Sequence, residues 1–181
     1  MDWNKKNRRV KSGLISIIGV LLCISCTVSY KFNGASINYD KVKTITITNF
    51  ENRALYQYGP MASMFNTQLQ DIFAQQTRLQ FVKRGGDLEI SGEITAYDQY
   101  NKSISAEGHS ALVELKMTVN VRFVNNTNHS EDFEQQFSAT QTYDSSLQLN
   151  SVQDKLVTDM IKDITDQIFN ATVANCLLYT S

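Results

Sequence analysis

The stretch "SALVELKMTVNVRFV", residues 110–124, decides the fold because its apolar and polar side chains alternate along most of its length. One side of this segment carries only apolar residues, namely Ala111, Val113, Leu115, Met117, Val119, Val121 and Phe123. The other side carries Glu114, Lys116, Thr118, Asn120 and Arg122. Such alternation predicts a strand with one buried face and one face in water, the pattern typical of an antiparallel sheet.

Four further segments have the composition of strands. Residues 88–96 alternate apolar and polar side chains, and residues 41–50 are rich in β-branched residues. Residues 28–37 form a shorter candidate, and residues 133–143 place Phe133, Phe137, Ala139 and Tyr143 at strand spacing. Polar or glycine-rich turn signals at 84–86 and 125–130 separate these segments.

Two segments instead have the 3.6-residue apolar period of amphipathic helices. In residues 60–77 the apolar stripe is Met61, Phe65, Leu69, Ile72 and Phe73, with Pro60 suited to the first helical position. The sequence "SVQD" (151–154) suggests a capping box that opens a second helix. Its stripe is Val152, Leu156, Met160, Ile161, Ile164 and Ile168.

The predicted order is therefore β-β-α-β-β-β-α. A sheet with one apolar face must bury that face against another layer, and the two helices can supply it. The sequence predicts an α+β, two-layer sandwich, with two helices on one face of a mainly antiparallel, four- to five-stranded sheet.

The N-terminal segment has the features of an export signal. A basic stretch, "NKKNRRVK" (4–11), precedes 11 apolar residues at 14–24, well short of the roughly 20 that span a membrane. The small residue Ser25 then precedes Cys26, which resembles the bacterial lipobox and predicts lipidation of Cys26. Cys23 is an alternative lipidation site, although bulky Leu22 would then lie at the cut. An ordinary secretory signal with an incidental cysteine is the other alternative.

This interpretation divides the chain into a signal peptide (1–25), a single domain (26–175) and a short tail (176–181). We expect the tail "CLLYTS" to be non-native, because a sequencing-adapter DNA end encodes the same six residues. Removal of residues 1–25 leaves 12 basic and 17 acidic residues, a net charge of about −5. An acidic domain argues against nucleic-acid binding.

Residues with catalytic chemistry are scattered along the sequence. His109 and His129 have no companion at metal-ligand spacing, and Glu89, Glu93 and Glu114 fall on the predicted wet faces of strands. A general acid–base pair could be drawn from these carboxylates, but a solvated strand face explains them better. The sequence therefore predicts no enzyme, no metal site and no cofactor other than the acyl lipid on Cys26.

Two segments are candidate interaction surfaces. Residues 55–65, "LYQYGPMASMF", are dense in tyrosine and methionine, which are enriched at interfaces, but core packing also explains part of them. Lys83 and Arg84 lie in a predicted turn and could contact the phosphates of a glycolipid; a solvated turn is the alternative.

Taken together, these segments resemble a known family. A lipobox cysteine followed by "YKFNGASI", "KTITITNFENRA", a helix, "LEISGEITAYD", a long alternating strand and a C-terminal helix is similar to LptE, the lipopolysaccharide-assembly lipoproteins. The resemblance covers residues 26–175 and is nearest the Bacteroidetes branch.

The resemblance implies a function that the residue pattern does not itself give. An LptE-like protein would be anchored in the outer membrane of a Gram-negative bacterium and would face the periplasm. It would act as plug and assembly partner of the LptD β-barrel in lipopolysaccharide transport, and Lys83 and Arg84 are the candidates offered for glycolipid contact. A competing hypothesis is a periplasmic lipoprotein that serves another envelope complex as scaffold or activator, or that binds a small ligand.

Overall fold

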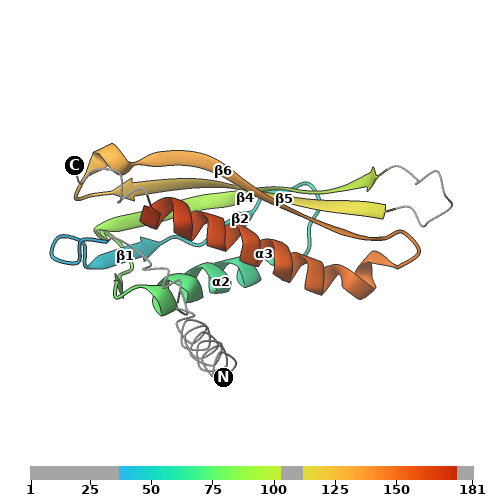
Figure 1. Cartoon of the computed structure of the whole chain (residues 1–181), viewed down its shortest axis with the longest axis horizontal. Coiled ribbons are helices and arrows are strands. Elements are labelled where there is room, and N and C mark those ends of the chain that lie inside the picture. The colour runs from blue at the N-terminus through green and yellow to red at the C-terminus, as the bar shows by residue number, and fades with distance from the viewer. Residues whose placement is uncertain (1–36, 103–111, 175–181) are drawn as a thin grey trace, which may run out of the picture. The chain divides into compact units, whose positions relative to one another are not determined.

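The computed structural model describes residues 37–102 and 112–174, which belong to one compact unit. In this part of the chain, helices α2 (Met61–Gln76) and α3 (Leu149–Ala174) lie on one face of a mixed sheet, as Figure 1 shows. The predicted α+β arrangement of two helices and one sheet is confirmed. Most of the short strand predicted at 28–37 falls outside the described residues.

The sheet has six strands in the order β3-β1-β4-β5-β6, with β2 paired to β4 beside this path. Their bounds are Thr44–Ile47 (β1), Glu51–Asn52 (β2), Gln80–Phe81 (β3), Leu88–Lys102 (β4), Leu112–Asn125 (β5) and Phe133–Asp144 (β6). The long strands β4, β5 and β6 pair antiparallel, whereas β1 and β2 pair parallel to β4 and β3 pairs parallel to β1. Strands of two residues, such as β2 and β3, are too short to show a period in the sequence.

The prediction for the central strand is confirmed. Strand β5 alternates as expected, and the six inward side chains within its bounds are buried: Val113, Leu115, Met117, Val119, Val121 and Phe123. The polar side chains between them lie on the opposite face, which the helices leave uncovered (Figure 1).

Strand β4 departs from the simple alternation. Its register against β5 shifts between Ile94 and Ala96, so that Thr95 is an extra residue in the ladder. Such a β-bulge reverses which side chains face inward. Tyr97, which the uninterrupted pattern would have placed on the wet face with Thr95, is therefore 1% exposed and lies opposite Met117.

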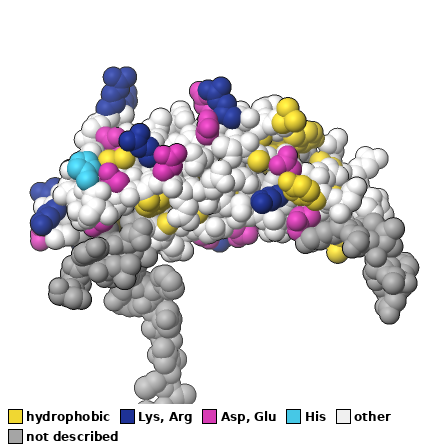
Figure 2. Space-filling view, turned by 90° about the horizontal axis from the view of Figure 1, so that it is seen from above, with side chains coloured by type: hydrophobic (Ala, Val, Ile, Leu, Met, Phe, Trp, Pro, Cys, Tyr) yellow, Lys and Arg dark blue, Asp and Glu magenta, His cyan; other side chains and the backbone are white. Residues whose placement is uncertain are grey.

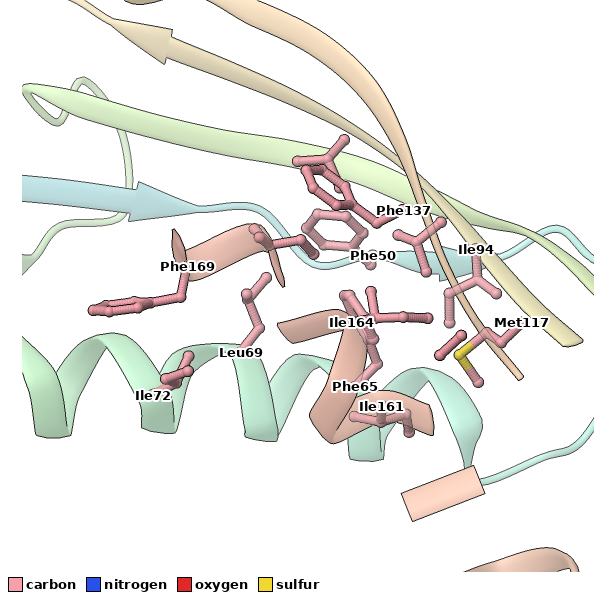
Figure 3. Close-up of a cluster of buried hydrophobic side chains, with 14 of the residues drawn as sticks. Phe50, Phe65, Leu69, Ile72, Ile94, Met117, Phe137, Ile161, Ile164 and Phe169 are labelled. Carbon is pink, nitrogen blue, oxygen red and sulfur yellow. The ribbon is translucent and has the colours of Figure 1, made fainter. Parts of the chain in front are cut away.

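The core lies between the helices and the sheet, as Figure 3 shows. Phe65 and Leu69 of α2 and Ile164 of α3 reach toward Ile94 and Met117 of the sheet. Phe50, in the segment between β1 and β2, packs with its ring centroid 5.0 Å from that of Phe65. Burial of these large side chains is the main force that joins the two layers.

Two polar contacts fix the β1–β2 connection to the rest of the fold. The side-chain oxygen of Asn66 on α2 accepts a hydrogen bond from the Phe50 N–H at 2.8 Å, and the Asn66 amide nitrogen donates to the Phe50 carbonyl at 3.0 Å.

Gly92 of β4 lies against the Phe50 ring. A Cβ on Gly92 would lie 2.1 Å from the Asn120 carbonyl oxygen and 2.5 Å from the Phe50 ring. Only glycine lets Phe50 pack this closely over β4.

One helix boundary was predicted wrongly. Helix α3 begins at Leu149, so Ser151 lies inside its first turn rather than at the cap. The Ser151 hydroxyl donates to the Gln148 carbonyl at 2.7 Å, a local bond that a helix start also permits. The capping-box interpretation of residues 151–154 is therefore corrected.

Candidate interaction surfaces

The face of the sheet that the helices leave open is polar, and its centre carries little charge. Figure 2 shows this side of the molecule, where the middle is mostly uncharged. Two cross-strand pairs bring opposite charges together, Asp98 opposite Lys116 and Arg122 opposite Glu134. Between these pairs the face consists mainly of hydroxyl and amide side chains, namely Thr118, Asn120, Gln136, Ser138 and Thr140.

The predicted basic turn lies where the chain passes from β3 to β4. Gly85 has a φ of 68°, which favours glycine, and a Cβ on Gly86 would lie 2.7 Å from the Thr46 backbone nitrogen. The predicted turn is therefore present, and it holds the backbone close over β1. Lys83 and Arg84 are exposed in it, and neither forms an ion pair with the residues that the structure describes.

Asp87 closes this turn onto β1. Its carboxylate accepts hydrogen bonds from the backbone N–H groups of Lys43 and Thr44, at 2.8 and 2.9 Å, and from the Thr44 hydroxyl at 2.9 Å. These donors, the Lys43 N–H first, lower the pKa of the Asp87 carboxyl below its ordinary value. Sequence reasoning placed Asp87 in a glycine turn but gave no sign of this role.

The opposite end of the long strands is apolar. Five large side chains are exposed there: Leu55, Tyr56, Tyr100, Leu112 and Leu147. Tyr100 and Leu112 lie where β4 ends and β5 begins, and Leu147 follows β6. We name these five residues the apolar end; hydrophobic side chains gather at one end of the face in Figure 2.

A small pocket of about 140 Å³ opens at the apolar end. It is lined by Tyr56, Tyr97, Asp98, Gln99, Leu115 and Leu149. The rings of Tyr56 and Tyr97 lie 5.5 Å apart, and the Tyr97 hydroxyl accepts a hydrogen bond from the Gln153 amide of α3 at 3.1 Å. Burial raises the pKa of the Tyr97 hydroxyl, so the group stays protonated.

Core packing explains part of residues 55–65, and an interface role for the exposed part stays a prediction. Met61 and Phe65 are fully buried in the core, whereas Leu55 is fully exposed and Tyr56 is half exposed. Tyr58 donates a hydrogen bond to the Asp154 carboxylate of α3, which ties the segment to the helix layer. The exposed half therefore belongs to the apolar end.

The scattered titratable residues remain scattered in the described part of the chain. His129 lies in a 3-10 turn, His129–Glu131, with its Nδ1 atom 3.0 Å from the Asp132 carboxylate. Glu93 is exposed on the open face, and Glu89 accepts a hydrogen bond from Asn126. Residues 37–102 and 112–174 contain no cluster of three metal-ligating side chains.

Several predictions concern residues outside the described part. Cys23 and Cys26, His109 and Cys176 all lie there, so lipidation stays a prediction. None of the helices in the described ranges is long and apolar enough to cross a membrane. The apolar end was missed, although Leu112 gave a signal: it is an apolar residue in the polar phase of residues 110–124.

Solved structures share this fold at low sequence identity. A minor lipoprotein from Acinetobacter baumannii aligns with a TM-score of 0.51 and 15% identity, covering 74% of this chain and 94% of that one. An uncharacterized lipoprotein B from Nitrosomonas europaea gives a TM-score of 0.51 and 19% identity, covering 76% and 86%. A putative neuraminyllactose-binding hemagglutinin homolog from Helicobacter pylori gives 0.51 and 10%, covering 78% and 88%.

At these identities the likeness shows the fold alone. No curated protein matches the chain. The family assignment comes instead from the sequence, because the model of the lipopolysaccharide-assembly family LptE matches residues 42–172, which include every strand of the sheet and most of α3. The chain belongs to the LptE family of lipopolysaccharide-assembly proteins.

Proposed function

We propose that this protein is an outer-membrane lipoprotein that acts as plug and assembly partner of an LptD-type β-barrel in lipopolysaccharide transport. The observation that carries the proposal is the open face of β4, β5 and β6. These strands have 15, 14 and 12 residues, and their uncovered side is polar, with mainly hydroxyl and amide groups at its centre and charged side chains around them. The lumen of a large membrane barrel is polar, so such a face is suited to lie against it.

The apolar end supports a protein partner rather than a free-standing domain. Five exposed large apolar side chains at one end of the sheet form the kind of patch that marks an interaction site. The role is one of binding, because holding a barrel and passing a glycolipid need no bond to be made or broken by this chain. The pocket at the apolar end gives the small-ligand alternative little support, since its volume of about 140 Å³ is below the roughly 300 Å³ at which ligand sites begin. The larger hollow of about 320 Å³ between α2 and α3 is shallow and open to solvent.

The test is affinity purification of the full-length protein from detergent-solubilised outer membranes, followed by mass spectrometry. We expect a large β-barrel at near-equal stoichiometry. Recovery of the protein alone, or with an enzyme of cell-wall synthesis, would overturn the plug proposal and favour the scaffold or activator role.

Anchoring through Cys26 is a separate part of the proposal. A Cys26→Ala variant should leave the outer-membrane fraction, because it loses acyl chains worth about 0.8 kcal/mol for each buried CH₂. Cys23→Ala is the matched control and should fractionate as the unchanged protein does. If Cys23→Ala alone releases the protein, the lipidated residue is Cys23. If neither variant does, the anchor lies elsewhere.

We assign the exposed pair Lys83 and Arg84 to contact with glycolipid phosphate. Both cations are without ion pairs to the described residues, so a phosphate would not have to displace a partner. The double variant Lys83→Ala/Arg84→Ala should lower lipopolysaccharide binding in a pull-down. Lys155→Ala/Lys162→Ala on α3 is the control of equal charge, and equal losses in both would indicate nonspecific attraction.

A further inference from the structure

Strand β6 is the last strand of the sheet, and its outer edge is open. Its twelve residues, Phe133–Asp144, pair with β5 over their whole length and with no other strand of the described residues. An edge strand presents backbone N–H and C=O groups that a further strand can bond. The location of those groups therefore decides what the edge can bind.

Two hydrogen bonds show which backbone groups of β6 point away from β5. The Thr95 hydroxyl of β4 donates to the Thr118 carbonyl at 3.3 Å, so the backbone of Thr118 points toward β4 rather than toward β6. In an antiparallel pair the residue opposite then points its own groups outward. That residue is Ser138, and the Gln167 amide of α3 does donate to its carbonyl from outside the ladder, at 3.3 Å.

Backbone direction alternates along a strand, so the six even-numbered residues of β6 share the direction of Ser138. Glu134, Gln136, Ser138, Thr140 and Thr142 are exposed, and Asp144 at the end of the strand is half-buried. Two outward carbonyls have a hydrogen-bond partner among the described residues: that of Ser138, bonded by the Gln167 amide, and that of Asp144, bonded by the Leu147 N–H. The remaining outward groups lie on exposed residues, where a further strand can reach them.

The edge carries few of the devices by which proteins discourage strand addition. Many natural edge strands carry lysine, proline or a bulge, or are short. Residues 133–144 contain no lysine, arginine or proline, and their pairing with β5 runs without a register shift. This edge is long and regular; its charged residues are Glu134 and Asp144, near its two ends, and helix α3 contacts it at Ser138.

The side chains of β6 specify the pattern of an added strand. Phe137, Ala139 and Tyr143 face the helices and are buried, whereas the even-numbered residues face the open side. A strand beside β6 must therefore alternate apolar side chains toward the helix layer with polar ones toward the open face. Alternation with this period is the sequence pattern of a transmembrane β-strand.

A second copy of this chain fits the edge less well. Helix α3 runs beside β6, and its flank at the edge is marked by the contact of Gln167 with Ser138. Asp163 and Asn170, one turn before and after Gln167, share that flank, and all three side chains are exposed. Two copies paired through β6 would bring these two polar flanks together and remove them from water, which costs free energy. A single added strand brings no second helix and avoids this cost.

We propose that β6 captures, by strand addition, a strand of the partner β-barrel before that barrel closes. The inference rests on the proposed function, in which the barrel is the partner. A closed barrel has no free strand edges, so such pairing can exist only in the unclosed state. Strand addition at β6 would thus belong to the assembly role, and the plug contacts would replace it after closure.

The test uses a photo-crosslinking amino acid at Thr140 in the full-length lipoprotein in cells, with pulse-chase labelling. We expect an adduct with newly made barrel that disappears as the barrel reaches its closed, heat-resistant form. The same amino acid at Gln70, an exposed position on α2, is the control and should give no such early adduct.

A backbone variant makes the test specific to the edge. Thr140→Pro removes one outward N–H and leaves the bonds to β5 intact, so with the crosslinker at Gln136 the early adduct should fall at least about fivefold. If this variant fails to fold, the test is whether crosslinkers at Gln136, Ser138 and Thr142 in the otherwise unchanged protein give the same early barrel adduct.

Three results would overturn the inference: an adduct with a second copy of this chain, an adduct confined to closed barrel, or no barrel adduct from the edge. The affinity purification separates this failure from that of the proposed function. A barrel that copurifies but never crosslinks to the edge leaves the plug role standing without strand capture. If no barrel copurifies, both proposals fail.

Discussion

At the scale of single residues, Gly92 shows how strictly local sterics can fix a position. The Phe50 ring and the Asn120 carbonyl occupy the space where any larger residue would place its Cβ. Both obstacles are anchored, Phe50 by its two bonds to Asn66 and Asn120 by the β5 ladder. A side chain at this position must therefore push the β1–β2 connection off the sheet.

We predict that Gly92→Ala lowers the free energy of unfolding by at least about 2 kcal/mol, because overpacking forces the backbone to shift. Urea denaturation of the chain without residues 1–25 measures this. Gly59→Ala is the matched control: no atom lies within 4 Å of its Cβ position, so the change should stay within about 0.5 kcal/mol. Equal effects of the two variants would contradict the steric account.

Asp87 predicts a dependence of stability on pH. Its pKa is lowered in the folded state, so the carboxylate stabilises the fold above the unfolded-state pKa of about 3.9. This contribution is lost as pH falls through the lower, folded-state pKa. Asp87→Asn should therefore cost about 1–2 kcal/mol at pH 7, and the difference from the unchanged protein should shrink below about pH 4.

Denaturation series at pH 7 and pH 3 measure this difference. Asp71→Asn on α2 is the control, because Asp71 is exposed and far along the chain from the turn. A difference between Asp87→Asn and the unchanged protein that stayed constant with pH would show that the ionised carboxylate is not what stabilises the turn.

At the scale of elements, the sequence predicted what periodicity can reveal. Residues 60–77 and 110–124 became α2 and β5 within two residues at each end, because a long amphipathic pattern has one stable way to be buried. The bulge at Thr95 left no such trace. A bulge breaks alternation for one residue only, and "ITAYD" has apolar side chains in both phases.

The strand at 41–50 was predicted, but its parallel pairing was not. Nothing local in residues 44–47 shows that β1 lies between β3 and β4, since that order is decided by the turn at 82–87 and by the contacts of Asp87. The surface features likewise divide into those that local sequence shows and those that only tertiary structure creates. Lys83 and Arg84 were placed correctly in an exposed turn, whereas the apolar end required tertiary structure to bring Leu55, Leu112 and Leu147 together.

The bulge creates a contact between elements that can be measured. Tyr97 of β4 and Gln153 of α3 form a buried hydrogen bond, so Tyr97→Phe should cost about 1–3 kcal/mol by leaving the amide without its acceptor. In the double variant Tyr97→Phe/Gln153→Leu both polar groups are gone, and we expect part of the stability to return. Strictly additive losses in this double-mutant cycle would show that the two residues are not coupled.

At the scale of the whole molecule, the two ends of the long strands differ in chemistry. The described chain enters beside β1, close to the turn that carries Lys83 and Arg84, whereas the apolar end lies where β4 ends and β5 begins. In the proposed complex the basic turn would contact glycolipid phosphate, and the apolar end would contact the barrel at the opposite end of the long strands.

The open face between these ends gives the decisive prediction for the plug. Thr118 lies at the centre of that face, opposite Ser138, and its side chain is partly exposed. Thr118→Arg places a long cation on the surface proposed to meet the lumen, where it would be desolvated without a partner. We expect unchanged folding, read by thermal denaturation, and a barrel recovery lowered by at least about tenfold, which corresponds to 1.4 kcal/mol of binding.

The matched control is Gln70→Arg on the exposed side of α2, which adds the same charge to the helix layer. If Thr118→Arg alone weakens recovery of the barrel, the open sheet face is the surface that binds it, because both variants carry the same net charge. If Gln70→Arg has the larger effect, the helices meet the lumen and the assignment of the sheet face is wrong. The comparison works only because α2 and β5 belong to opposite layers of the sandwich, so one substitution in each samples the two surfaces separately.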